Sequence, residues 1–406
     1  MKMDPLDIVG NLSNIKPAYQ PVFSAVKHDI IGYEVLGRID HEGVWKSLGD
    51  FFQDSQVPDE FKLEVDTHIL TIAIEDIMKH DDKKLLFINR NAKELMLENG
   101  ETFIEALQPF VERGFSLSRI VLEITEHDFD EDFESLNHLL LYYKTYGIQI
   151  AVDHVGAKSS NLDRLRQLEP HILKVDSKVL RDNDSSGYQD IIYSLSMLAR
   201  RIGAALLFEN IEDSFQLYYA WKHGGRFYQG FYLGEPSYHF LDPFEKESLI
   251  KSQVDSFIRR EKEVIEKRLE FVLKWDQCLR DSLVHWDGPK RADSYLDKVT
   301  SDFNYESFRM YICDSNGKQI SSNFRQRDEE WIKEPEILGT NWAFRPYFLE
   351  NMMQMKTWNK GRLSDLYSDI ETREMVRTFS FPLSDHHFIF IDIRYDFIYE
   401  NESLLM

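Results

Sequence analysis

The chain has 406 residues, of which 43% are hydrophobic and 29% charged, a composition typical of globular proteins with about two or three domains. Its formal net charge of −22 at pH 7 argues against binding of duplex nucleic acid, which requires a basic surface. No apolar run approaches the roughly 18 residues of a membrane span. Cys278 and Cys313 are the two cysteines, too few for a disulfide framework. We therefore expect a cytoplasmic protein without a membrane span.

Two segments near the N-terminus have strand character. Residues 19–23 and 30–39 are rich in β-branched and aromatic side chains. About six residues separate them, which is too few for a crossover helix. We therefore expect these two strands to be antiparallel.

Helices and strands then alternate. The spacing of apolar residues predicts helices over residues 59–79, 103–111, 132–146, 162–168, 188–202 and 214–223. Strands are predicted over residues 85–88, 120–124, 148–152, 172–175, 204–208 and 227–233. Together with the first two strands, this pattern predicts an α/β fold, a (β/α)8 TIM-type barrel over residues 1–243 with an antiparallel first strand.

Polar side chains stand at the carboxyl ends of these strands, the face on which such barrels carry their active sites. Four of them offer hard oxygen ligands, namely Glu34, Asn89, Glu123 and Asp153. These ligands suit magnesium, manganese or calcium better than zinc. Lys174 beside them would orient a metal-bound water or neutralise a phosphate oxygen, so the predicted reaction is metal-assisted hydrolysis of a phosphate ester. The alternative is that these residues only cap turns and solvate the barrel rim.

The rest of the chain predicts a connector and a second module. Residues 244–287 contain no glycine or proline and have apolar residues near helical spacing, so we expect a connector helix over 244–289. Its long polar interruptions predict an exposed helix that pairs with a second copy, giving a homodimer. Residues 290–406 predict an α+β domain with strands over 308–313, 375–383 and 388–394 and a helix that begins within 341–349.

The order of the motifs in residues 15–240 resembles the EAL domain, the family of cyclic di-GMP phosphodiesterases. The resemblance rests on Gln20-Pro21-Val22, Glu34-Val35-Leu36 with Arg38, Asn89, Glu123-Ile124-Thr125-Glu126, Lys174-Val175-Asp176, Glu209 to Glu212, and Gln229-Gly230-Phe231-Tyr232.

The resemblance implies a role for each of these residues. One metal ion would be held by Glu34, Asn89, Glu123 and Asp153. Glu209 would support a second metal, Lys174 would serve the nucleophilic water, and Glu126 would anchor a loop of the active site. Cyclic di-GMP would be seated by Gln20, Leu36, Arg38, Asp176, Glu212 and Gln229.

The chain departs from the family after the strand that ends at Asp153. The family usually has Asp-Asp-Phe-Gly-Thr-Gly-Tyr-Ser-Ser-Leu there, whereas residues 153–162 read Asp-His-Val-Gly-Ala-Lys-Ser-Ser-Asn-Leu. His154 replaces a carboxylate that resembles a ligand of the second metal, which weakens that site for magnesium. Val155, Ala157 and Lys158 alter the loop, and Asn210 replaces a glycine beside Glu209.

The C-terminal domain resembles PAS-like or Cache-like sensory modules. The resemblance rests on Arg345-Pro346-Tyr347-Phe348 and Asp365-Leu366-Tyr367. Arg345 with Trp342 and Tyr347 would suit a small carboxylate, a ligand of unknown identity. The alternative is that these residues are a helix cap and core aromatics.

Three functions compete at this point. The first is a receptor that binds cyclic di-GMP with a divalent cation in a degenerate EAL barrel. The second is a slow, regulated phosphodiesterase that produces the linear dinucleotide, and the third is an interaction protein independent of nucleotides. Intact Gln20, Glu34 and Arg38 argue against the third, and His154 with the altered loop favours the first over the second.

Overall fold

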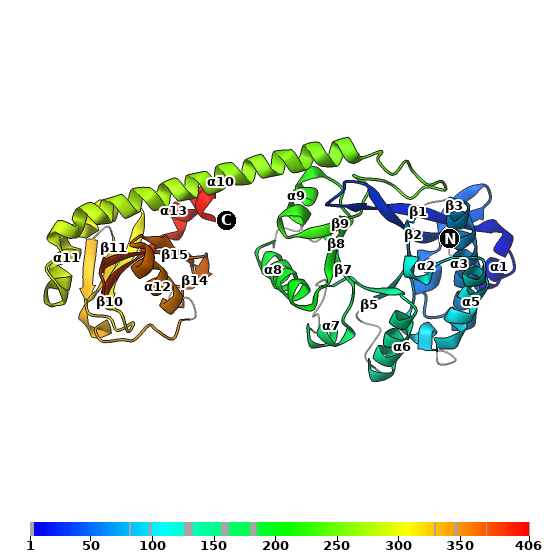
Figure 1. Cartoon of the computed structure of the whole chain (residues 1–406), viewed down its shortest axis with the longest axis horizontal. Helices are drawn as coiled ribbons and strands as arrows, with labels where there is room; N and C mark the ends of the chain where they lie inside the picture. Colours follow the sequence, from blue (N-terminus) through cyan, green and yellow to red (C-terminus); the bar gives the residue numbers. More distant parts are fainter. Residues whose placement is uncertain are drawn as a thin grey trace. The chain divides into compact units, whose positions relative to one another are not determined.

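A computed structural model describes residues 4–80, 83–96, 100–125, 133–155, 162–178, 185–328, 330–345, 348–370 and 372–405. The chain divides into two compact units, Met1–Phe257 and Ile258–Met406. The long helix α10 (Glu247–Ser282) begins in the first unit and ends in the second (Figure 1). Among the described residues, no helix is both long and apolar enough to cross a membrane.

The first unit is the predicted barrel. Its sheet has the order β1-β9-β8-β7-β6-β5-β4-β2-β3, and the additional pairing of β1 with β2 closes the ring. Eight strands of the described chain form the ring, and their bounds are β1 (Ile15–Ser24), β2 (Ile30–His41), β4 (Leu85–Asn89), β5 (Ile120–Thr125), β6 (Gln149–Asp153), β7 (Ile172–Asp176), β8 (Ala205–Glu209) and β9 (Gly225–Tyr228). The short β3 (Val44–Ser47) extends β2 outside the ring.

The first strand runs against its neighbours, as expected. β1 pairs antiparallel with both β2 and β9, whereas β2, β4, β5, β6, β7, β8 and β9 follow one another in parallel. The pairing places Gln20 directly opposite Glu34. A residue near the middle of β1 therefore reaches the same end of the barrel as a residue of the parallel strand β2.

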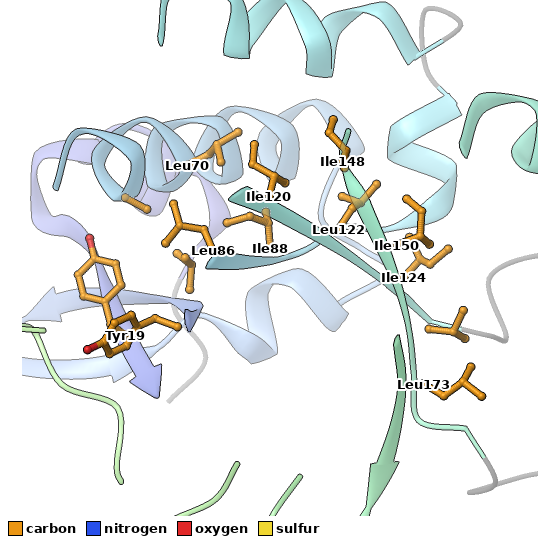
Figure 2. Packing of buried hydrophobic residues seen from close by; sticks show 14 of the residues in the cluster. Tyr19, Leu70, Leu86, Ile88, Ile120, Leu122, Ile124, Ile148, Ile150 and Leu173 are labelled. Atoms are coloured by element: carbon orange, nitrogen blue, oxygen red, sulfur yellow. The ribbon is translucent and has the colours of Figure 1, made fainter. Parts of the chain in front are cut away.

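Helices cover the outside of the ring. Their bounds are α1 (Pro5–Val9), α2 (Gly49–Gln53), α3 (Asp59–Lys79), α4 (Ala92–Met96), α5 (Glu101–Glu112), α6 (Phe133–Thr145), α7 (Leu162–Leu168), α8 (Ser185–Ile202) and α9 (Ser214–Lys222). α3 begins with Asp59 and Glu60 after Pro58 and carries Lys79 in its last turn, a charge order that suits the helix dipole. Leu70 of α3 packs over strand residues such as Leu86 and Ile120 (Figure 2).

Two strands of the first unit differ clearly from the sequence-based expectation. β9 ends at Tyr228, because the chain turns at Gly230, whose φ of 151° favours glycine, and Leu233 N–H then donates to the Gly230 carbonyl. The prediction of a strand over 227–233 was therefore wrong beyond Tyr228. β3 was not predicted, because its four residues are partly or fully exposed and carry no strong alternation.

Two layers of side chains fill the inside of the barrel. The lower layer is apolar and consists of Val22, Phe87, Val121, Ala151, Ile172 and Leu207. Side chains two residues apart on a strand point to the same face. The next inward positions on the parallel strands β4 to β8 are therefore Asn89, Glu123, Asp153, Lys174 and Glu209, which form a polar layer on the apolar one.

The second unit is an antiparallel sheet with helices. The sheet has the order β12-β11-β10-β16-β15-β13, with β14 paired to β15. The strands are β10 (Ser307–Asp314), β11 (Asn323–Arg327), β12 (Glu330–Glu334), β13 (Arg362–Leu363), β14 (Tyr367–Ser368), β15 (Met375–Ser384) and β16 (His387–Ile393), and the helices after α10 are α11 (Ala292–Val299), α12 (Phe348–Trp358), α13 (Tyr395–Glu400) and α14 (Glu402–Leu405). Trp275 and Leu279 of α10 pack in the core of this unit, whereas Phe257 packs in the core of the barrel.

Candidate functional site at the barrel mouth

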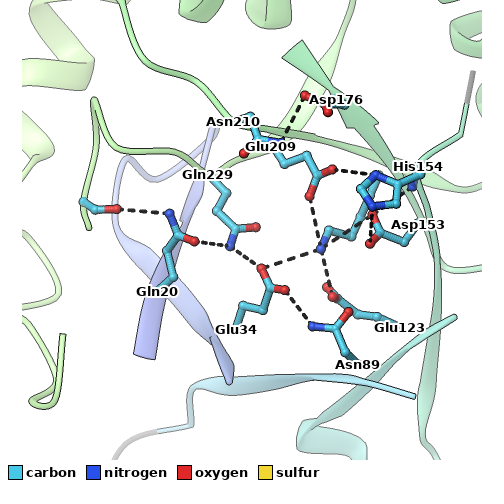
Figure 3. Close-up of polar contacts among 12 residues, drawn as sticks. Gln20, Glu34, Asn89, Glu123, Asp153, His154, Asp176, Glu209, Asn210 and Gln229 are labelled. Carbon is cyan, nitrogen blue, oxygen red and sulfur yellow. Dashed lines mark hydrogen bonds and ion pairs between the residues drawn. The ribbon is translucent and has the colours of Figure 1, made fainter. Parts of the chain in front are cut away.

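A single buried lysine lies at the centre of the polar layer. The Lys174 ammonium lies 2.8 Å from Glu123 Oε2 and 3.3 Å from Glu209 Oε2. It also lies 3.6 Å from Glu34 Oε2 and 3.8 Å from Asp153 Oδ1 (Figure 3). Four strands thus deliver carboxylates to one ammonium group that is 1% exposed. Such crowding of like charge is costly unless cations compensate it.

The pKa values of these groups reflect the crowding. Burial raises the pKa of Glu123 well above its usual range, although Lys174 opposes this effect. Burial likewise raises the pKa of Asp153 to about 6. Burial alone would lower the pKa of Lys174, but the surrounding carboxylates raise it well above its usual range. The lysine is therefore a permanent cation at neutral pH and acts as a donor to oxygen atoms.

A chain of amides holds the opposite side of the ring. Asn89 Nδ2 donates to Glu34 Oε1 at 2.7 Å, and Gln229 Nε2 donates to Glu34 Oε2 at 2.5 Å. Gln229 Nε2 also approaches Gln20 Oε1 at 3.3 Å, and Gln20 Nε2 donates to the Gly234 carbonyl at 3.3 Å. The Glu34 carboxylate is therefore oriented by donors from β4 and from the segment after β9.

His154 lies between two carboxylates of the ring. Its Nδ1 is 3.4 Å from Glu209 Oε1 and its Nε2 is 3.7 Å from Asp153 Oδ2. The interaction with Glu209 raises the pKa of His154 to about 9, against an opposing effect of burial. Burial would raise the pKa of Glu209, but Lys174 and His154 together lower it to about 2. The His154 ring thus lies where the family pattern has a carboxylate that resembles a ligand of the second metal, and Asp153, His154 and Glu209 bring ligand atoms within 4.8 Å of one another.

The residues that directly follow β6 and β8 adopt the left-handed backbone region. His154 and Asn210 both have a φ of 56°. Asparagine tolerates this region better than most residues with a side chain, which explains how it replaces the glycine of the family pattern beside Glu209. Asn210 Nδ2 donates to Asp176 Oδ1 at 3.0 Å, so the substitution adds a contact between the ends of β7 and β8.

A cavity of about 920 Å³ opens above the ring. This volume is at the upper end of the range of about 300–1,000 Å³ that is usual for small-molecule sites. Four of the residues predicted to seat the ligand line it, namely Gln20, Leu36, Arg38 and Gln229. Asp176 and Glu212 lie outside the lining; Asp176 instead accepts from Asn210, and the Glu212 backbone N–H donates to Gln216 Oε1 at 2.7 Å. Glu126, Ala157 and Lys158 lie outside the described residues.

The ring fits a divalent cation by its chemistry. Glu34, Asn89, Glu123 and Asp153 converge with oxygen-bearing side chains, the ligands that hard cations prefer. Glu123 Oε1 is buried and, within the described part of the chain, has no hydrogen-bond partner. A cation would satisfy this atom and offset the excess of carboxylates over Lys174.

The sequence analysis did not identify all residues that line the cavity. Lys62, Asp66 and Arg90 also line it, and Arg90 forms an ion pair with Asp66. Lys62 had a detectable signal, because it occupies the inward stripe of α3 where apolar residues are expected. Arg90 and Asp66 had none, because charged residues near strand ends and on helices are usually exposed.

Comparison with known proteins identifies the barrel. The EAL domain family matches residues 9–236, which is more than half of the chain. The chain belongs to the EAL domain family. Residues 242–405 match a second family, described as an EAL-domain associated signalling protein domain. The C-terminal unit is therefore a signalling domain that accompanies EAL barrels, and this match does not extend to the PAS-like or Cache-like assignment.

Two relatives are similar over the whole chain or over the EAL domain. The EAL-domain containing protein YkuI of Bacillus subtilis is 45% identical over 406 residues, covering 99% of this chain and 100% of YkuI. A probable cyclic di-GMP phosphodiesterase of Escherichia coli, PdeA, is 26% identical over 50% of this chain, which matches 28% of its own length.

A solved structure of YkuI is similar over both units. The crystal structure of YkuI in complex with the substrate cyclic di-GMP and calcium has a TM-score of 0.94 and 44% identity, covering 99% of this chain and 100% of YkuI. The complex of the PaMucR phosphodiesterase with cyclic di-GMP has a TM-score of 0.50 and 21% identity over 58% of this chain and 98% of that one, a likeness of fold.

Proposed function

We propose that this EAL domain binds cyclic di-GMP together with a divalent cation and hydrolyses it slowly or not at all. The observation that carries the proposal is the ring of Glu34, Asn89, Glu123 and Asp153 beneath a cavity of about 920 Å³. The bound ligand and calcium of YkuI, which is 44% identical in structure-based comparison, support it.

The residues at the barrel mouth would have separate roles in binding the cation and the phosphate. Glu34, Asn89, Glu123 and Asp153 would hold magnesium, manganese or calcium, and the cation would neutralise phosphate oxygens and activate water. Arg38, which is partly buried and lines the cavity, would donate to a phosphate oxygen. Lys174 keeps the carboxylates together and presents a permanent positive charge beneath the scissile phosphate.

The weak hydrolysis follows from His154. Two-metal hydrolysis of a phosphate ester stabilises the attacking and leaving oxygens with ions about 3.5–4 Å apart. His154 places its imidazole between Asp153 and Glu209, so these three residues could hold a metal ion together. A nitrogen ligand in place of a carboxylate would hold magnesium less well, which would lower the occupancy of the second metal site while leaving the ring around Lys174 intact.

The test combines two measurements on the full chain. Calorimetry with cyclic di-GMP in calcium measures binding, and single-turnover hydrolysis in magnesium or manganese measures chemistry. Binding with negligible conversion to the linear dinucleotide supports a receptor. Binding with rapid conversion would instead support the alternative, a regulated phosphodiesterase, which the retained Lys174 and Glu209 favour. Absence of binding would contradict both the receptor and the phosphodiesterase and would leave the third function, an interaction protein independent of nucleotides.

We also propose that the chain forms a homodimer through α10. Four apolar side chains of this helix are exposed and lie along one face, namely Ile258, Ile265, Leu269 and Leu273. Antiparallel pairing of two copies would place Glu261 opposite Arg268 of the partner subunit and Arg259 opposite Glu266 of the partner subunit. Parallel pairing would instead bring Glu261 towards Glu266 of the partner subunit, which is unfavourable. The charges therefore support the antiparallel arrangement.

For the C-terminal unit we propose a PAS-like or Cache-like sensory role with a small carboxylate as ligand. A cavity of about 10 Å³, room for about one water molecule, lies between α12 and the sheet and is lined by Arg345, Tyr311 and Ser380, among others, so the ligand would enter only as this cavity widens. The Arg345 guanidinium also lies 4.4 Å from the centre of the Trp342 ring. Tyr347, the third residue of the predicted group, lies outside the described residues. A rise in melting temperature with sodium acetate over equimolar sodium chloride, absent in Arg345→Gln, tests this role.

A further inference from the structure

A lysine lies on the buried face of a helix beside the ligand cavity. The inward stripe of α3 consists of Lys62, Val65, Ile69 and Ala73, at the spacing of one helix face. The other three members are apolar and at most 4% exposed, whereas Lys62 carries a charge and is 6% exposed. The stripe thus has a cation at a position that folding alone would fill with an apolar residue.

The charge of Lys62 is not neutralised by the protein. Within the described ranges, the Lys62 ammonium has no hydrogen-bond or ion-pair partner. Asp66, one turn further along α3, is paired with Arg90. Lysine is almost never this deeply buried without a partner, because removing an ammonium group from water is costly. Folding therefore buries the stem of Lys62 and leaves its ammonium group, without a partner among the described residues, at the edge of the ligand cavity.

The Lys62 side chain borders the ligand cavity. Lys62 lines the cavity of about 920 Å³ that also contains Glu34 and Arg38. A ligand atom that accepts hydrogen bonds there would gain a charged donor whose stem is already held in place by the packing of a helix. The acceptors of cyclic di-GMP are the phosphate and ribose oxygens of its backbone and, on the edge of the base, O6 and N7 of guanine.

Part of the cavity wall suits a base. Leu36 and Phe52, both partly exposed, line it with apolar surface on which the face of a purine can pack. Lysine and arginine bind guanine through O6 and N7, whereas adenine presents an amino donor in place of O6.

We propose that Lys62 reads a guanine base of the dinucleotide through O6 and N7 and so determines specificity for guanine over adenine. This inference rests on the proposed function, because it concerns the ligand of the same cavity.

The test compares Lys62→Met with a matched control, Lys79→Met. Both changes remove one positive charge from α3, but Lys79 lies at the exposed end of the helix, where it pairs with Asp76. Methionine fills a buried position without a charge, so Lys62→Met should melt at the same temperature as the wild type or higher. Calorimetry then measures the affinity of each full-length protein for cyclic di-GMP and for cyclic di-AMP, both with calcium.

The expected result is a loss of about tenfold or more in cyclic di-GMP affinity for Lys62→Met, with no change for Lys79→Met. The preference for cyclic di-GMP over cyclic di-AMP should shrink in parallel. Equal losses for both nucleotides would indicate a contact to the phosphate or ribose that they share and would overturn the guanine assignment. Unchanged affinity, or a lower melting temperature as the only effect, would make Lys62 a structural residue. If the wild type binds neither nucleotide, the proposed function fails and the inference fails with it.

Discussion

Gln20 and Glu34 lie directly opposite each other on the antiparallel strands β1 and β2. Gln229 Nε2 connects them, with contacts of 3.3 Å to Gln20 Oε1 and 2.5 Å to Glu34 Oε2. On β1 the polar residue Gln20 comes two positions before Val22, which belongs to the apolar layer. On the parallel strands the polar residue comes two positions after the residue of that layer. The inverted direction of β1 therefore brings Gln20 to the same end of the barrel as the other polar residues. Residues separated by more than 200 positions in the chain thus form one hydrogen-bonded group.

Removing the Lys174 ammonium group should lower the stability of the barrel, and a bound metal ion should restore part of that stability. Lys174→Ala leaves Glu34, Glu123 and the other ring carboxylates without their buried cation, which typically costs about 3–5 kcal/mol. We expect a large fall in the free energy of unfolding measured with urea in a chelator, and partial recovery with calcium. Lys178→Ala, an exposed lysine four residues further on, serves as the control. Equal stability of the two variants would contradict the central role of Lys174.

Loss of Arg38 should weaken ligand binding without affecting the fold. A hydrogen bond from a charged donor contributes about 1.5–3 kcal/mol, so Arg38→Ala should weaken cyclic di-GMP binding by about tenfold to a hundredfold in calorimetry. Arg226→Ala removes an exposed arginine at the start of β9 and should bind as the wild type does. Wild-type affinity in Arg38→Ala would remove this residue from the ligand contacts.

Restoring the carboxylate should restore chemistry more than binding. His154→Asp replaces an imidazole between Asp153 and Glu209 by an oxygen ligand, which favours occupancy by a second magnesium ion. We expect faster magnesium-dependent single-turnover hydrolysis, with a further increase when Val155, Ala157 and Lys158 become Phe, Thr and Gly. Rapid hydrolysis by the wild type that His154→Asp does not change would refute the role given to His154.

A histidine far from the site should set part of the acid sensitivity. Burial, with a smaller effect of Lys222, lowers the pKa of His223 to about 4 from its usual value near 6.5. Because the folded state binds this proton less tightly than the unfolded state, its contribution to stability is present above pH 6.5 and is lost as pH falls towards 4.

The test compares His223→Gln with the wild type in urea at pH 7 and pH 4.5. The wild type should lose more stability than the variant across this interval, by on the order of 1–3 kcal/mol. The carboxylates titrate in both proteins, so the difference between them isolates His223. Parallel pH profiles would show that its titration is not linked to folding.

An introduced charge on α10 should dissociate the proposed dimer. Leu269→Glu places a carboxylate in the exposed apolar stripe, whereas Glu270→Gln changes charge beside it. Light scattering at tens of micromolar should give a dimer for the wild type and Glu270→Gln and a monomer for Leu269→Glu. A monomeric wild type would contradict the proposed homodimer.

Much of the barrel was predictable because its signals are local. α3 and α7 have the bounds expected from apolar spacing, and the six-residue interval after residue 23 was sufficient to predict the inverted first strand. Strand ends also marked most of the ring, because a residue two positions beyond an inward apolar residue shares its face.

Other features depend on contacts that no local pattern encodes. β11 and β12 are rich in charged residues and show no apolar alternation, and they join the sheet because β11 pairs with β10 on one side and with β12 on the other. The position of His154 against Glu209 joins the ends of β6 and β8, and the ion pair of Arg90 with Asp66 joins the end of β4 to α3. The distances between such partners follow from the closure of the ring rather than from either segment alone.

The closure itself is uneven. β1 is registered with β2 from Ile15↔Ile39 to Phe23↔Ile30, but it meets β9 only through Phe23↔Tyr228 and Ser24↔Phe227 in the described structure. We expect the barrel to open first at this short β1–β9 pairing. The amide protons of Phe227 and Tyr228 should therefore exchange with solvent at a lower free energy of opening than those of β5 or β6.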